Sequence, residues 1–160
     1  MVLRRYDDAR AQGDEAGARR ALVEALGLIQ SLTARSPADG NLWALLAAID
    51  SGLNGFGAST EAYLRLSQAN APFEFPALRK RVALRLAALD DLGPPDREAL
   101  TRDIGVLLSA EPKHREIAFM ADAARPRAPV AIAFAREAIV RKAPDWAPAF
   151  DQFLRARPDF

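Results

Sequence analysis

Apolar residues recur along almost the whole chain at intervals of three and four, and this spacing constrains the fold more than any other feature. It is the spacing of an α-helix with one buried face, so each run of it predicts one amphipathic helix. We therefore expect about eight or nine helices, most of them with a loop-forming break on either side. The runs are Ala18, Ala21, Leu22, Ala25, Leu28, Ile29 and Leu32; Leu42, Leu45, Leu46 and Ile49; Ala62, Tyr63, Leu66 and Ala69; Leu78, Val82, Leu86 and Leu89; Leu100, Ile104, Leu107 and Leu108; Ile117, Met120, Ala121 and Ala124; Ala131, Phe134, Ala135 and Ala138; and Trp146, Ala149, Phe150 and Phe153.

Helix-breaking residues separate these runs or stand in first helical turns, where proline is tolerated. Asp39, Asp96 and Asp145 are candidates for N-caps, because a carboxylate there can accept from an orphan backbone amide. No alternating run of β-branched residues predicts a strand. Short loops between helices force neighbours to run antiparallel, so residues 1–160 are expected to form a single all-α domain. The separating residues include Pro37, Gly40, the Gly52 to Gly57 stretch, Pro72, Pro76, Gly93-Pro94-Pro95 and Pro144.

Charge and cysteine content limit the classes of function. The 22 Lys and Arg residues nearly balance the 21 Asp and Glu residues, which argues against a dedicated nucleic-acid binder. With no cysteine, a disulfide framework and a cysteine zinc site are both excluded. The start of the sequence lacks the apolar core of a signal peptide, and no apolar run is long enough to span a membrane. The chain as given is therefore expected to be cytoplasmic; a periplasmic or membrane-tethered location stays open if its N-terminus is truncated.

Candidate catalytic groups are few. His114 is the only histidine, and it is expected to be an exposed residue of a first helical turn. Carboxylate chemistry stays open, but Asp7-Asp8 and Asp90-Asp91 are adjacent pairs that point about 100° apart on a helix. Gly52, Gly55 and Gly57 fit no phosphate-binding motif and are expected to form a turn between two helices. These patterns predict neither a catalytic site, nor a metal site, nor a cofactor.

Residues 37–72 resemble a tetratricopeptide repeat, a family whose repeat of about 34 residues forms two antiparallel helices. The match covers the aromatic and small positions that set how closely the two helices pack. The resemblance implies a stack of helix pairs that curves into a superhelix and binds other proteins. Residues 1–36 and 73–160 would add divergent helix pairs. Two positions depart from the family pattern, Asp50 at an aromatic site and Leu66 at a small one. The matching residues are Trp43, Leu46, Ala47, Ser59, Tyr63 and Pro72.

A second stretch resembles small repeat proteins encoded with bacterial exopolysaccharide synthesis. It runs from Ala71 to Pro112, and its residues are Ala71-Pro72-Phe73-Glu74, Leu78-Arg79-Lys80-Arg81, and Arg97-Glu98-Ala99-Leu100 to Asp103-Ile104. This resemblance implies an accessory or scaffolding role in a polysaccharide synthesis or export assembly.

Two sets of residues are candidates for partner binding. Asn41, Ala44 and Ala48 are expected to line the concave face of the repeat, and Arg79, Lys80, Arg81 and Arg85 form the densest basic cluster, expected on a solvated helix face. The sequence thus predicts a noncatalytic adaptor that binds another protein or a peptide segment. Two alternatives stay open: an obligate subunit of a larger complex without a groove of its own, and a small helical enzyme that uses carboxylates.

Overall fold

The computed structural model describes residues 2–109, 113–124 and 129–156. Over these residues it contains nine α-helices and no strand, which confirms the all-α class and the expected number of helices. The chain divides into two compact units, Met1–Ala77 and Leu78–Phe160, and the boundary falls in the first turn of a helix. The single domain expected for residues 1–160 stays a prediction.

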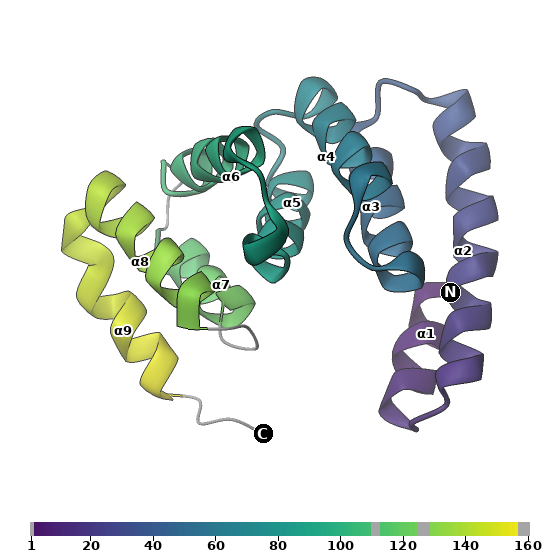
Figure 1. Ribbon diagram of the computed structural model, residues 1–160, viewed down its shortest axis with the longest axis horizontal. Helices are drawn as coiled ribbons and strands as arrows, with labels where there is room; N and C mark the ends of the chain where they lie inside the picture. The colour runs from purple at the N-terminus through teal and green to yellow at the C-terminus, as the bar shows by residue number, and fades with distance from the viewer. Residues whose placement is uncertain (1, 110–112, 125–128, 157–160) are drawn as a thin grey trace. The chain divides into compact units, whose positions relative to one another are not determined.

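The first unit is a row of helices in which each packs against the next. These are α1 (Val2–Ala11), α2 (Glu15–Arg35), α3 (Gly40–Asn54) and α4 (Ala58–Asn70). The connecting segments are only a few residues long, so consecutive helices run antiparallel, as Figure 1 shows for α1 with α2 and for α3 with α4. The predicted pairing of neighbouring helices is therefore present in this unit.

Side-chain caps fix two of these helix starts. Asp39 accepts hydrogen bonds from the backbone amides of Asn41 (2.9 Å) and Leu42 (3.3 Å), which confirms its predicted role as N-cap of α3. Asp14 caps α2 in the same way, accepting from the amide of Gly17 at 2.7 Å. The predicted caps Asp96 and Asp145 are wrong. Gly93 precedes the proline-started helix that contains Asp96, and Asp145 lies inside a 3₁₀ turn.

The core of the first unit joins α2 to α3. Leu22, Ala25 and Ile29 of α2 pack with Leu46 and Ile49 of α3, and partly buried aromatic side chains cover this cluster. Two of those aromatics, Trp43 and Tyr63, stack with ring centroids 6.0 Å apart, so they join α3 to α4 within one helix pair. The Trp43 indole N–H donates to the Pro37 carbonyl at 2.7 Å, which satisfies its polar group.

The turn between α3 and α4 lies in the predicted glycine stretch. Gly55 ends α3 with φ = +81°, a conformation that glycine adopts without steric cost. At the other end of the pair, Gly40 lies against the end of α4. A Cβ added to Gly40 would come within 2.3 Å of the Ala71 Cβ and 2.8 Å of the Ser67 carbonyl oxygen. Gly40 therefore allows the close approach of the two helix ends.

The buried face of α4 differs from the predicted one. Thr60, Glu61, Leu64 and Ser67 are buried, whereas the predicted stripe residues Ala62, Leu66 and Ala69 are exposed. The helix is therefore rotated relative to the expectation and buries Leu64 in place of Leu66, and its buried polar groups have partners. Thr60 donates to the Asp50 carboxylate at 2.6 Å, and Glu61 forms an ion pair with Arg65 at 3.7 Å.

The second unit contains most of α5 (Phe75–Ala87), together with α6 (Pro94–Leu107), α7 (Lys113–Ala124), α8 (Pro129–Lys142) and α9 (Ala147–Ala156). The 3₁₀ helices Leu89–Asp91 and Pro144–Trp146 lie between α5 and α6 and between α8 and α9. Helix α8 contacts α6, α7 and α9, and α9 also packs on α7. The predicted apolar stripes of α5, α6 and α7 are confirmed as core. Their buried residues are Leu78, Val82, Leu86, Leu89, Leu100, Ile104, Leu107, Leu108, Ile117, Met120, Ala121 and Ala124.

Helix α9 contacts α7 and α8, and an ion pair joins it to α8. Phe150 is fully buried, whereas Trp146 and Phe153 are only partly buried, so the predicted aromatic stripe is core in its middle. The Arg136 guanidinium donates to Asp151 at 3.0 and 3.1 Å. These hydrogen bonds, more than the accompanying charge attraction, hold the pKa of Asp151 below its ordinary value and raise the pKa of Arg136.

We expect Gly40→Ala to destabilise the protein by about 1–3 kcal/mol, because the added methyl group would overlap backbone atoms that no rotamer change can move. The measurement is the urea midpoint of the loss of helical circular dichroism. Gly27→Ala is the matched control. Gly27 is an exposed residue of α2 with nothing within 4 Å of an added Cβ, so alanine there should raise stability by about 0.5–1 kcal/mol. Equal effects of the two variants would contradict the close approach at Gly40.

Asp151→Asn should make the free energy of unfolding depend less on pH in acid. Since the folded pKa of Asp151 lies below its unfolded value of about 3.9, the Arg136 pair contributes fully above about pH 4 and is lost as the pH falls through the folded pKa. The free energy of unfolding of the wild type should therefore be slightly larger than that of the variant at pH 7, and this difference should disappear in acid. Urea unfolding at a series of pH values measures it. A margin independent of pH would contradict the assignment.

Candidate functional site

The predicted partner-binding residues of α3 do not form an open surface together. Ala44 is fully buried and packs with Ala71 and Ala77, so its expected place on a concave face is wrong: that face of α3 is covered by the end of α4 and the start of α5. Asn41 is partly buried and donates through Nδ2 to Glu74 at 2.6 Å, while its Oδ1 has no hydrogen-bond partner among the described residues. Ala48 is partly exposed.

The predicted basic cluster of α5 is divided between the core and the surface. Arg81 and Arg85 are 0% exposed, so their expected place on a solvated face is wrong. Arg79 is half-buried and pairs with Glu116 of α7, and its guanidinium also lies 5.7 Å from the centre of the Phe119 ring. The hydrogen bond to Glu116 raises the pKa of Arg79, and burial lowers the pKa of Lys80.

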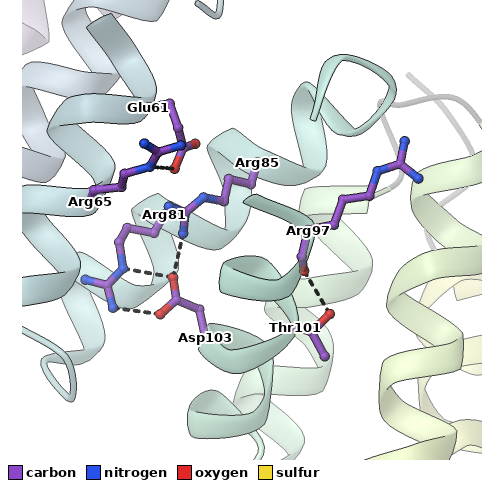
Figure 2. Close-up of polar contacts among 7 residues, drawn as sticks. All are labelled: Glu61, Arg65, Arg81, Arg85, Arg97, Thr101 and Asp103. Carbon is purple, nitrogen blue, oxygen red and sulfur yellow. Dashed lines mark hydrogen bonds and ion pairs between the residues drawn. The ribbon is translucent and has the colours of Figure 1, made fainter. Parts of the chain in front are cut away.

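Asp103 of α6 explains the burial of the two arginines. Figure 2 shows the guanidinium groups of Arg81 and Arg85 directed at this one carboxylate. Arg81 binds both carboxylate oxygens at 2.9 Å, and Arg85 binds Oδ2 at 3.0 Å. Asp103 is itself 2% exposed. A paired Arg and carboxylate of this kind is the form in which charges are tolerated in a core. These cations therefore tie α5 to α6.

The opposite side of α6 borders an open hollow of about 1140 Å³ within the second unit. In Figure 2 the Arg97 side chain extends away from Asp103, so the two residues mark different faces of α6. The hollow follows one face of α6 and is closed at one side by the C-terminal end of α8. Its lining residues are Pro94, Pro95, Arg97, Glu98, Thr101, Arg102, Gly105, Val106 and Ser109 from α6 and its C-terminal end, and Arg141 and Lys142 from α8.

Cations dominate the rim of this hollow. Four of its lining residues, Arg97, Arg102, Arg141 and Lys142, are cationic, and Glu98 is the one carboxylate among them. Arg97 donates to the carbonyls of Leu92 and Leu89, each at 3.1 Å, which fixes the orientation of its guanidinium without neutralising it. Arg141 is paired with Glu137 at 2.6 Å.

Two of the four rim cations have no carboxylate partner in the described part of the chain. Among the described residues, no carboxylate lies within ion-pairing distance of Arg102 or Lys142. Arg102 is exposed on α6 and Lys142 is exposed at the end of α8, so each of the two helices that line the hollow contributes one cation without a described carboxylate partner.

Small residues form the floor of the hollow. Thr101, Gly105 and Ser109 follow each other at intervals of four, so they share one face of the helical segment. Gly105 stands in the interior of α6, where glycine costs about 1 kcal/mol relative to alanine. Packing does not require it, because a Cβ at Gly105 would meet only the Lys142 Cε, at an ordinary 3.8 Å. The aliphatic end of the Lys142 side chain therefore lies next to Gly105, and Gly105 adds no side chain of its own to the hollow.

This hollow was missed from the sequence because its residues come from separate helices. The signal available was the polar and small face of residues 97–109 opposite the apolar stripe, which by itself is typical of any solvated helix. The position of Lys142 beside Gly105 depends on how α8 packs on α6, and the apolar spacing does not determine that packing.

The other candidates for chemistry give no assembled site in the described part of the chain. His114 is exposed in the first turn of α7, as expected. Asp90 and Asp91 are exposed in the 3₁₀ turn after α5. No cluster of three potential metal ligands occurs among the described residues. None of the described helices combines the length and the apolar character needed to cross a membrane.

Comparisons with protein-family models, with curated proteins and with solved structures found no match to this chain.

Asp103→Asn should lower the free energy of unfolding by about 3–5 kcal/mol, because it leaves two buried guanidinium groups without their carboxylate. Glu137→Ala is the control. It removes an exposed ion pair between residues four apart on a helix, and such a pair contributes only about 0.3–0.5 kcal/mol. Urea unfolding measures both variants. Similar losses would mean that the buried pairs add little to stability.

Proposed function

We propose that this chain is a noncatalytic adaptor, built from tetratricopeptide-like helix pairs, that holds a segment of a partner protein in the hollow along α6. The observation that carries the proposal is the shape of the hollow. From Pro94 to Val106 the lining runs along twelve residue steps of α6, or about 18 Å at the rise of an α-helix. An open channel of that length suits an elongated occupant better than a compact metabolite.

The volume of the hollow supports the same conclusion. Sites for small ligands commonly enclose about 300–1,000 Å³ and bury most of the ligand. The hollow along α6, at about 1140 Å³, lies above that range and is open to solvent. A peptide segment can bind such a surface while keeping one side in water, as in other groove-binding proteins.

The resemblance to accessory proteins of exopolysaccharide synthesis supplies a setting for this adaptor. In that setting the partner would be a component of a synthesis or export assembly. This assignment depends on the resemblance alone.

The obligate-subunit alternative keeps one supporting observation. On α2, Val23, Leu28 and Leu32 are 55%, 51% and 38% exposed, so three large apolar side chains of one helix reach solvent. If a partner covers this helix permanently, the isolated chain should aggregate, and coexpression with that partner should keep the chain in solution.

A peptide library displayed on phage and selected against the immobilised chain tests the adaptor proposal. We expect enriched peptides that bind the chain in solution, measured by fluorescence anisotropy. Gly105→Leu should weaken them by at least about tenfold, which is about 1.4 kcal/mol, because its side chain fills the floor of the hollow.

Gly27→Leu is the matched control for Gly105→Leu. It places the same side chain on another helix glycine with open space around it, and binding should be unchanged. Equal binding by both variants would place the peptide site elsewhere. Failure to enrich any peptide would contradict the adaptor proposal.

A further inference from the structure

The rim charges of the hollow have a consequence for what it binds. Over the whole chain cations and anions are nearly equal, at 22 and 21. Around the hollow, four lining cations face one lining carboxylate, Glu98, and Glu137 pairs with one of the four, Arg141, so positive charge is in excess there. The hollow also borders the part of α6 that the core does not use. Asp103 and its arginines are buried on one side, and Arg97, Arg102 and Lys142 border the other.

We infer that the hollow along α6 binds an extended acidic segment of a partner protein, with its carboxylates between Arg102 on one side and Lys142 on the other. This inference rests on the proposed adaptor function and adds the chemical class of the partner. Charge complementarity carries it, because both cations are exposed and neither has a carboxylate within ion-pairing distance among the described residues.

The dimensions set the length of that segment. An extended chain rises about 3.3 Å per residue, so the roughly 18 Å of α6 that lines the hollow accommodates about five or six residues. Gly105 and Thr101 line the hollow on the α6 side, where neither presents a large side chain, and the Lys142 side chain lies next to Gly105.

Arg97 differs in role from Arg102 and Lys142. Its guanidinium is held by the Leu92 and Leu89 carbonyls, so it supplies a fixed positive charge near the start of α6. Arg141 is the least available of the four, because Glu137 already accepts its hydrogen bond. Reversing the charges of Arg102 and Lys142 should therefore remove most of the attraction while leaving the helix-end contacts of Arg97 intact.

The probe is a fluorescein-labelled oligo-glutamate peptide of about eight residues, slightly longer than the hollow. We expect the full chain to bind it measurably by fluorescence anisotropy and to bind an oligo-glutamine peptide of equal length at least about tenfold more weakly. Raising the salt from about 0.1 M to about 1 M shortens the screening length from about 10 Å to about 3 Å, so binding should weaken steeply.

The decisive variant is Arg102→Glu with Lys142→Glu, which should reduce binding of oligo-glutamate by at least about tenfold. Its matched control is Arg4→Glu with Arg115→Glu. This control makes the same change in net charge at two exposed arginines outside the hollow and should change binding by less than about twofold. Circular dichroism and urea midpoints close to wild type would establish that both variants are folded.

Three results would overturn the inference. Equal losses in the two double variants would mean that overall charge, and not the hollow, attracts the peptide. Equal binding of oligo-glutamate and oligo-glutamine would remove the charge argument. Tighter binding of a single-stranded oligonucleotide of equal charge, lost in the Arg102 and Lys142 variant alone, would assign the hollow to nucleic acid.

The adaptor proposal can survive this failure. If peptides selected from the displayed library bind in the hollow but are neutral or basic, the acidic-segment inference is wrong and the adaptor function stands. If no displayed peptide is selected and oligo-glutamate does not bind, both proposals fail.

Discussion

The second unit depends on one carboxylate in its core. Asp103 receives both Arg81 and Arg85, and all three side chains are almost completely buried. Charges withdrawn from water in this way cost several kcal/mol each unless their hydrogen bonds are made, so the position of α6 against α5 is fixed by geometry as well as by apolar contact. Helix α5 is also tied to α7 through Arg79 and Glu116. The face of α6 that carries Asp103 is therefore used entirely for holding the unit together.

Because one face of α6 is used in the core, its opposite face is available for the proposed binding. The hydrogen bonds of Asp103 resist rotation of α6 about its axis, so the residues on the far side, Arg102 and Gly105 among them, keep lining the hollow. Binding sites are more accurate when they lie on rigid elements, and a helix held by a buried bidentate ion pair is such an element. The same residue type thus serves in the core at Arg81 and at a proposed binding surface at Arg102.

The helical class and most core positions follow from the sequence because they depend on a local period. The stripes of α5, α6 and α7 are buried as predicted, since apolar side chains at intervals of three and four can reach the core only from one face. On α4 the apolar spacing predicted the wrong buried face, since Thr60 and Ser67 are buried and Leu66 is 40% exposed. There, Leu64 is buried in place of Leu66, and the hydroxyl of the buried Thr60 is bonded to Asp50. The prediction for the basic cluster was wrong because Asp103, a carboxylate distant in the sequence, binds Arg81 in the core. The hollow could not be predicted either, since it exists only where α8 meets α6.

Two helix glycines, Gly40 and Gly105, differ in whether packing requires them. Gly40 is required by packing, because backbone atoms of the α4 end occupy the space of its missing side chain. Gly105 is not, because its neighbour is the flexible end of Lys142 at an ordinary distance. A residue that lowers helix stability by about 1 kcal/mol without a packing reason calls for another explanation. The place of Gly105 beside Lys142 in a cation-rimmed hollow is such an explanation, and it connects the choice of one residue in α6 to the proposed binding role of that face.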